Sequence, residues 1–212
     1  MGEMTSSWVA LLGLGAFHGI NPGMGWLFAV ALGLQERRRE AVLGALLPLG
    51  LGHALAVAVA IALALLAGAV IPLQWVRWSV AVILIGFGVS RLFRHRHPSW
   101  ASMRVSKGSL TMWSFLMASA HGAGLMVVPL FLGIAMPAAA HEMGHAGMHA
   151  STPAAALLAT SVHSLSYLAV TAAIAFLVFE KLGVGILRKA WFNVDLIWAI
   201  ALICTGVISV LL

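Results

Sequence analysis

The chain consists of long apolar stretches separated by short polar ones. Six apolar segments can be distinguished, at 8–34, 41–67, 74–93, 110–136, 153–179 and 190–212. Each is long enough to cross a hydrocarbon core of about 30 Å as an α-helix, because a helix rises about 1.5 Å per residue. The segments are too long for buried strands. The pattern therefore predicts an all-α integral membrane protein with six transmembrane helices.

Composition agrees with this fold class. Hydrophobic residues make up 62% of the 212 positions and charged residues only 8%, whereas soluble domains carry about 25% charged residues. The partner expected for such a surface is the lipid bilayer, and the net charge of +6 does not indicate nucleic acid. Glycine-rich helix faces would permit a homo-oligomer. The single cysteine, Cys204, excludes an internal disulfide and a thiol-based electron relay.

The basic residues predict the orientation in the membrane. All of the 12 Lys and Arg residues except Arg77 lie between the first and second, the third and fourth, or the fifth and sixth segments, if Arg91 at the end of the third segment is counted with the loop that follows it. Because Lys and Arg concentrate in cytoplasmic loops, both termini and the loop at 137–152 are expected on the outer side. Arg77 lies beside Trp75 and Trp78 and is expected to anchor the chain at the interface. A bacterial inner (plasma) membrane is the expected location.

Three positions align between the two halves of the chain. The pairs are His18 with His121, His53 with His163, and Gly88 with Gly206. With three helices in each half, the second half enters the membrane in the opposite direction to the first. The sequence thus predicts two inverted three-helix repeats, 1–100 and 101–212, which together form one transmembrane domain. Many secondary transporters follow this plan and hold their substrate near the midplane on interrupted helices.

The aligned histidines lie well inside their apolar segments. Ionisable side chains at that depth are costly and indicate a functional site by default, although each imidazole could instead bond a backbone carbonyl and hold the bundle together. Neutral imidazoles from several helices are natural ligands of a transition-metal ion. The central metal site predicted in this way consists of His18, His53, His121 and His163.

Residues next to the first histidine add candidate metal ligands. Asn21 follows His18 by one helical turn and shares its face. Met24 can join the two only if the helix is broken. Pro22, with glycines on both sides of it, predicts such a break.

Two further residues are singled out in the second half. Met117 precedes His121 by one turn and is a candidate ligand on the same face. Tyr167, the only tyrosine, follows His163 by one turn. We expect its hydroxyl to orient the imidazole of His163, as partners behind metal-bound histidines do.

The outer loop carries a second concentration of possible ligands. In the stretch HEMGHAGMH, histidine recurs every fourth residue, at His141, His145 and His149. Short histidine-rich tracts indicate metal capture, and the alternative is a polar loop in which histidines cluster without a role. We expect these three histidines to bind metal weakly on the outer face.

Residues 18–24, HGINPGM, resemble the His-x-x-Asp-Pro-x-His motif in the first helix of the nickel/cobalt efflux family, within the lysine-exporter superfamily. His18 and Pro22 match the motif, while Asn21 and Met24 stand where the family has aspartate and the second histidine. The resemblance implies six helices in two inverted halves and gradient-driven export of nickel or cobalt. Because the two departures remove negative charge, the ligand set would suit copper(I) at least as well.

The function expected from these features is a permease, working as an exporter, for a transition-metal ion: nickel, cobalt or copper. A small amino-acid exporter is an alternative on the superfamily resemblance, and a haem-binding, cytochrome-like protein is another because paired histidines ligate haem. The chain is not expected to be an enzyme. A membrane metalloenzyme stays open, because a bound metal could activate water, but no Asp or Glu lies near the histidines in sequence to act as its base.

Overall fold

The computed structural model describes residues 2–93, 107–135, 152–182 and 194–211, and no strand occurs in these ranges. The elements are α1 (Gly2–Ile20), η1 (Pro22–Met24), α2 (Trp26–Glu36), α3 (Arg39–Val70), α4 (Leu73–Phe93), α5 (Lys107–Ala120), α6 (Ala123–Ala135), α7 (Thr152–Leu177), the π-helical turn η3 (Val178–Leu182) and α9 (Val194–Leu211). All six apolar segments of the sequence are helical in their described parts. The predicted all-α class is therefore confirmed.

Length and composition allow several of these helices to cross a membrane. Three described helices are long and apolar enough, over Arg39–Val70, Leu73–Ser90 and Pro153–Lys181. The pair α5 and α6, bent by 66°, would be a fourth span if it crosses as one unit. The apolar helices in the first segment and α9 are shorter. The fold is thus compatible with a helical membrane protein, while the number of six spans stays a prediction.

The surface of α3 shows why such a protein needs an apolar solvent. Leu47, Leu63 and Leu66 expose 67%, 60% and 66% of their surface, and similar leucines and valines cover the rest of this face. Contiguous apolar patches of this extent are unusual on soluble monomers. The ion pair of Arg39 with Glu180, 2.9 Å between Nε and Oε1, joins the start of α3 to η3, which follows α7. Lipid around the middle and water at the ends accommodate both observations.

The first apolar segment is interrupted where the sequence predicts a break. Asn21 has extended backbone angles, Pro22 begins the short helix η1, and Gly25 has φ of 151°, which a residue with a side chain rarely adopts. The indole Nε1 of Trp26 donates to the carbonyl of Ile20 at 2.9 Å. This bond satisfies one of the carbonyls left open at the end of α1. The predicted break at Pro22 is confirmed.

The fourth segment is interrupted at its histidine. Helix α5 ends at Ala120, His121 and Gly122 form a turn, and α6 begins at Ala123. Gly122 has φ of +72°, the left-handed conformation that glycine adopts without steric cost. The aligned segments of the two halves are therefore both broken, close to the aligned residues His18 and His121.

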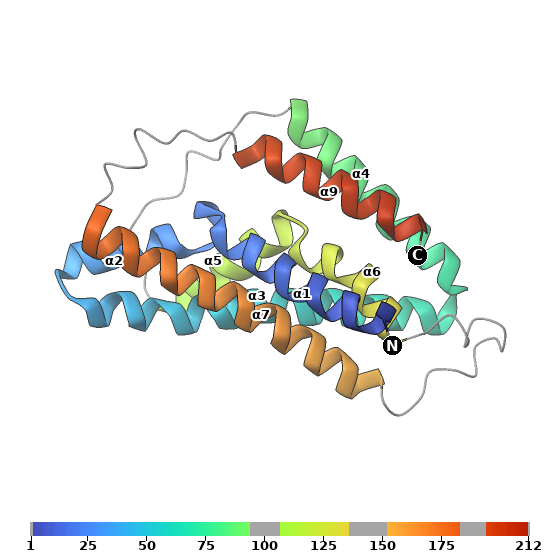
Figure 1. Ribbon diagram of the computed structural model, residues 1–212, viewed down its shortest axis with the longest axis horizontal. Helices are drawn as coiled ribbons and strands as arrows, with labels where there is room; N and C mark the ends of the chain where they lie inside the picture. Colours follow the sequence, from blue (N-terminus) through green and yellow to red (C-terminus); the bar gives the residue numbers. More distant parts are fainter. Residues whose placement is uncertain (1, 94–106, 136–151, 183–193, 212) are drawn as a thin grey trace.

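The two halves of the chain interlock. The most extensive helix–helix contacts are those of α4 with α9, α3 with α5 and α1 with α7, and each joins a helix from residues 1–100 to one from 101–212. Figure 1 shows α9 (red) running along α4 (green). Such pairing leaves neither half with a core of its own.

The contact between α4 and α9 is reciprocal. A Cβ on Gly88 would lie 2.8 Å from the carbonyl oxygen of Ala199 and 2.6 Å from Cγ1 of Ile203. One on Gly206 would lie 3.0 Å from the oxygen of Ala81 and 2.8 Å from Cγ1 of Ile85. The alignment that pairs Gly88 with Gly206 also pairs Ala81 with Ala199 and Ile85 with Ile203. Equivalent residues thus exchange equivalent contacts, as in an isologous interface.

Candidate functional site: a buried histidine cluster

Close packing of α1 on α7 positions the first histidine. A Cβ on Gly15 would overlap the backbone oxygen of His163, and one on Gly19 would lie 2.6 Å from that of Tyr167. The two glycines therefore allow the helix backbones to approach closely, as small residues do in membrane bundles. His18 lies between them on α1, near the break at Asn21.

Three imidazoles from three different helices meet in the interior. His18 of α1, His53 of α3 and His163 of α7 each have 0% of their surface exposed. The ring centroid of His18 lies 5.6 Å from that of His53 and 5.1 Å from that of His163. The centroids of His53 and His163 are 5.3 Å apart. We call these three residues the histidine cluster.

Backbone carbonyls determine which ring nitrogen carries the proton in two of these residues. Nδ1 of His18 donates to the oxygen of Leu14 at 2.6 Å, and Nδ1 of His163 donates to that of Leu11 at 3.3 Å. A carbonyl only accepts hydrogen bonds, so a neutral ring in this arrangement keeps its lone pair on Nε2. This is the arrangement in which metal-ligating histidines are commonly held.

The second pair of aligned histidines is in direct contact. Nε2 of His53 lies 3.2 Å from Nε2 of His163. Because the His163 nitrogen carries the lone pair, His53 donates the hydrogen bond between them. Two nitrogens bound to one tetrahedral metal at about 2.0–2.1 Å would be separated by roughly 3.3 Å. The observed spacing therefore suits a shared proton, and it would suit a shared metal ion if the proton of His53 moved from Nε2 to Nδ1.

Two buried ring nitrogens in the cluster lack hydrogen-bond partners within the described part of the chain: Nε2 of His18 and Nδ1 of His53. Unsatisfied buried polar atoms are costly and point to a ligand or a functional role. No group of three or more His, Cys, Asp or Glu side chains in the same residues is already arranged to hold a metal ion. The cluster thus presents one nitrogen pair at ligand spacing and a third ring beside it, which would have to turn to join them.

Tyr167 contacts a different histidine from the one expected. Its ring stacks on His53 with centroids 3.9 Å apart and planes at 10°, and its hydroxyl donates to the oxygen of Met24 at 2.6 Å. The imidazole of His163 is oriented instead by the hydrogen bond that its Nδ1 donates to the carbonyl of Leu11. Tyr167 therefore supports the cluster by packing and ties α7 to the broken segment of the first half.

His121 lies beside an indole that also contacts the cluster. Trp198 of α9 is 2% exposed, and its ring centroid is 4.9 Å from that of His18 and 5.5 Å from that of His121. Its Nε1 donates to the backbone oxygen of His121 at 2.9 Å. Nδ1 of His121 donates to the oxygen of Met117 at 2.8 Å. The aligned histidine of the first half, His18, makes the equivalent bond to the oxygen of Leu14.

Trp198 is a residue of the site that was not predicted from the sequence. The available signal was a tryptophan inside an apolar segment, because a buried indole N–H needs an acceptor. In the structure that acceptor is the carbonyl at the break of the fourth segment. The ring of Phe17 stacks on the indole of Trp198, with centroids 4.8 Å apart. Both rings also contact the imidazole of His18 edge-on.

The other candidate ligands near the break have structural roles. The Asn21 side chain accepts from the N–H of Gly23 at 2.9 Å and caps η1. Met24 is 2% exposed within the apolar core. The methyl carbon of Met117 lies 3.7 Å from where a Cβ on Gly23 would be. All three thus gather at the break, and none of the described hydrogen bonds joins their side chains to the imidazoles.

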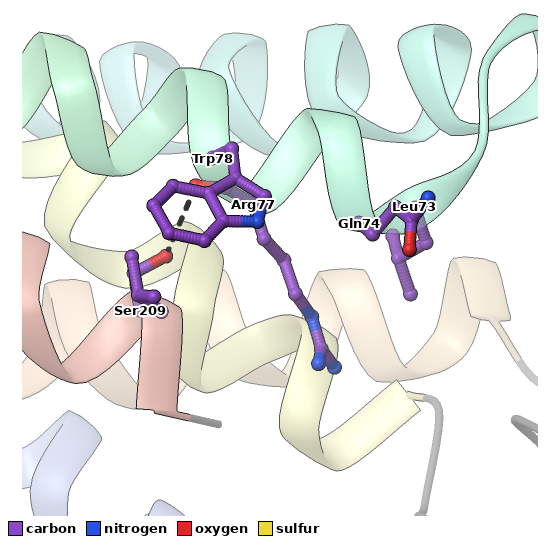
Figure 2. Close-up of a pocket in the computed structure, with 6 residues that line it drawn as sticks. Leu73, Gln74, Arg77, Trp78 and Ser209 are labelled. Carbon is purple, nitrogen blue, oxygen red and sulfur yellow. Dashed lines mark hydrogen bonds between the residues drawn. The ribbon is translucent and has the colours of Figure 1, made fainter.

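Two features remain, the three histidines predicted on the outer loop and a pocket at the end of α9. His141, His145 and His149 fall outside the described residues. Figure 2 shows a pocket between α4 and the end of α9, lined by Leu73, Gln74, Arg77, Trp78, Ser209 and Val210. The Ser209 hydroxyl donates to the backbone oxygen of Arg77 at 3.5 Å. Because the pocket contains no histidine, it is not part of the metal site that the sequence predicts.

Comparisons of this chain with protein-family models, with curated proteins and with solved structures found no match. The resemblance of residues 18–24 to the nickel/cobalt efflux family therefore stays a prediction from that motif. What the chain does has to be argued from its own residues and their geometry.

Proposed function

We propose that the chain is a membrane permease that exports a transition-metal ion through the histidine cluster. In this proposal the protein crosses a bacterial inner membrane six times, with both termini outside, as two inverted three-helix repeats. His18, His53 and His163 bind the ion in transit, and His121 serves as a neighbouring station beside Trp198. The observation that carries the proposal is the meeting of three fully buried imidazoles from α1, α3 and α7.

The condition of these imidazoles supports a binding role over a structural one. A histidine that only holds a bundle together is expected to have its polar atoms satisfied. Here Nε2 of His18 and Nδ1 of His53 are buried without a partner in the described residues. Placing unsatisfied nitrogens in an apolar interior costs stability, and a substrate ion that binds Nε2 of His18 would compensate for part of that cost.

The reciprocal contacts support the transporter architecture. Equivalent residues of the two halves meet at the pair His53 and His163, and the Gly88 and Gly206 contacts are exchanged between α4 and α9. Two halves related in this way can exchange conformations and open the centre alternately to each side. Both broken segments lie next to the histidines, where a transporter of this plan would hold its substrate.

The same geometry argues against the two alternative functions. Nε2 of His53 and Nε2 of His163, 3.2 Å apart, leave no space for a porphyrin ring between them. An amino-acid substrate carries two opposite charges, yet no Asp, Glu, Lys or Arg is buried among the residues whose side chains are described. Buried charges without a partner are disfavoured, so the cluster suits a small ion that accepts neutral nitrogen ligands.

Metal flux into or out of proteoliposomes tests the proposal. We expect His53→Ala and His163→Ala each to reduce flux by about 10²-fold or more, because loss of even a residue supporting a metal ligand costs 10–100-fold. Thr205→Val is the matched control: it also removes a polar group from a span, and the Thr205 hydroxyl bonds only within α9, to the oxygen of Ala201 at 2.8 Å. That variant should transport like the parent.

Helical content and monodisperse elution of each variant separate loss of transport from loss of folding. If both histidine variants fold and move every tested metal as fast as the parent, the cluster is not the transport site and the proposal is wrong.

A further inference from the structure

The buried polar side chains that the structure describes include none from Asp, Glu, Lys or Arg. Among the residues whose side chains are described, the buried polar ones are His18, Asn21, His53, Ser114, His121, His163, Ser164, Thr171 and Ser209. The carboxylates of Glu36, Glu40 and Glu180 are all exposed. An ion in the histidine cluster would therefore have nitrogen ligands and no buried anion near it in the described structure.

Charge decides which ion such a site can hold. The cost of moving an ion from water into a low-dielectric interior grows with the square of its charge, so a divalent ion meets about four times the penalty of a monovalent ion of similar size. Sites for divalent metals inside proteins often supply carboxylates or thiolates that cancel part of the charge, and sites built of three histidines keep a water or hydroxide on the metal for the same purpose. Three neutral imidazoles cancel none of it.

The number of available ligands leads to the same ion class. Nε2 of His53 and Nε2 of His163 lie 3.2 Å apart and the ring of His18 adjoins them, so the cluster offers at most three nitrogen ligands. Copper(I) and silver(I) are stable with few ligands and accept imidazole nitrogen, whereas Ni²⁺ and Co²⁺ favour more ligands, usually including oxygen. The described residues bring no oxygen ligand with a charge to the cluster.

We infer that the substrate of the histidine cluster is a monovalent d¹⁰ metal ion, copper(I), and that the site discriminates against divalent metals by charge. This inference rests on the proposed transport function and specifies its substrate. Copper is bound and released here as copper(I), with no change of oxidation state.

Zinc provides the sharpest comparison because Zn²⁺ and Cu⁺ have the same d¹⁰ configuration and differ in charge. Binding to the purified full-length protein would be measured with Cu⁺ under anaerobic reducing conditions and with Ag⁺, which needs no reductant. Zn²⁺, Ni²⁺ and Co²⁺ would be measured in parallel. We expect Cu⁺ and Ag⁺ to bind at least about ten-fold more tightly than Zn²⁺. The His53→Ala variant should lose the binding of both monovalent ions.

A second experiment introduces a negative charge near His18 by substitution of Asn21. Asn21 is 6% exposed, follows His18 by one turn and caps η1 through its side-chain oxygen. Asn21→Asp keeps the shape and the cap, since Asp is an equally good cap, and adds a negative charge. Asn21→Ser keeps a capping oxygen without the charge. We expect the ratio of Zn²⁺ to Ag⁺ affinity to rise about ten-fold in Asn21→Asp relative to Asn21→Ser.

The outcomes distinguish this inference from the proposed function. If the parent binds or transports Zn²⁺, Ni²⁺ or Co²⁺ as well as Ag⁺, and His53→Ala abolishes this, the cluster is a metal site but selection by charge is wrong. If neither binding nor transport of any tested metal depends on His53 or His163, both the selection by charge and the proposed transport function are wrong. Selection by charge is also wrong if a folded Asn21→Asp leaves the Zn²⁺ to Ag⁺ ratio equal to that of Asn21→Ser.

Discussion

The behaviour of the site at the scale of single residues follows from what each ring nitrogen contacts. Backbone carbonyls hold Nδ1 of His18 and His163, which leaves Nε2 of each as an acceptor. The sequence predicts the identity of these histidines because an imidazole inside an apolar helix is conspicuous. It does not predict that Tyr167 stacks on His53, because i and i+4 neighbours on α7 can be read from spacing and contacts between helices cannot.

Two substitutions of Tyr167 separate its two contacts. Tyr167→Phe keeps the ring on His53 and removes the hydroxyl bond to Met24, so the free energy of unfolding should fall by about 1 kcal/mol with metal affinity retained. Tyr167→Leu also removes the flat ring that holds His53, and metal affinity should fall about ten-fold. Thermal unfolding in detergent and metal titration measure the two effects. Equal loss of metal affinity in both variants would show that the hydroxyl, rather than the stacked ring, maintains the site.

At the scale of helices, the positions of glycines determine how close the histidines come. The break at Asn21–Gly25 was predictable because Pro22 and its neighbouring glycines are local signals. The turn at Gly122 and the contact of Gly15 with α7 were not, because a glycine in a membrane helix can be a lipid-facing residue or a packing contact. Gly13 and Gly15, two positions apart on α1, illustrate both cases.

Alanine substitutions at these two glycines should have opposite results. Gly15→Ala places a Cβ against the carbonyl of His163 and 2.9 Å from Cβ of Ser166, so we expect about 1–3 kcal/mol of destabilisation from overpacking and weaker metal binding as α1 moves from α7. Gly13→Ala meets no atom within 4 Å and should be neutral or stabilise the helix by up to about 1 kcal/mol. Unfolding midpoints in detergent give the comparison. Similar midpoints for the two variants would contradict this account of α1 packing.

At the scale of the molecule, each half supplies what the other lacks. Helices α1, α3 and α4 find their most extensive contacts on α7, α5 and α9, and the histidine cluster draws His18 and His53 from one half and His163 from the other. The aligned pairs were visible in the sequence. The direct contact of His53 with His163 was not, because alignment shows which positions correspond and says nothing about which of them touch.

The reciprocal packing of α4 and α9 predicts matched effects. Gly88→Ala and Gly206→Ala each place a Cβ against the equivalent alanine carbonyl and isoleucine of the partner helix, so each should destabilise the protein by about 1–3 kcal/mol. Gly86→Ala, on the same helix with no atom within 4 Å, should have no such effect. The midpoints of thermal unfolding test this. A large effect at one of the two paired glycines and none at the other would show that the contact is not symmetric in energy.

The helices, the first break and the identity of the buried histidines could be predicted from the amino-acid sequence. These depend on local physics: apolar length, the missing N–H of proline, and the cost of an ionisable group away from water. The meeting of three of the four histidines, and the contacts of Trp198 with both His18 and His121, became visible in the folded structure. These contacts join residues far apart along the chain, and they depend on how closely helices approach and on which side of each helix faces its neighbour.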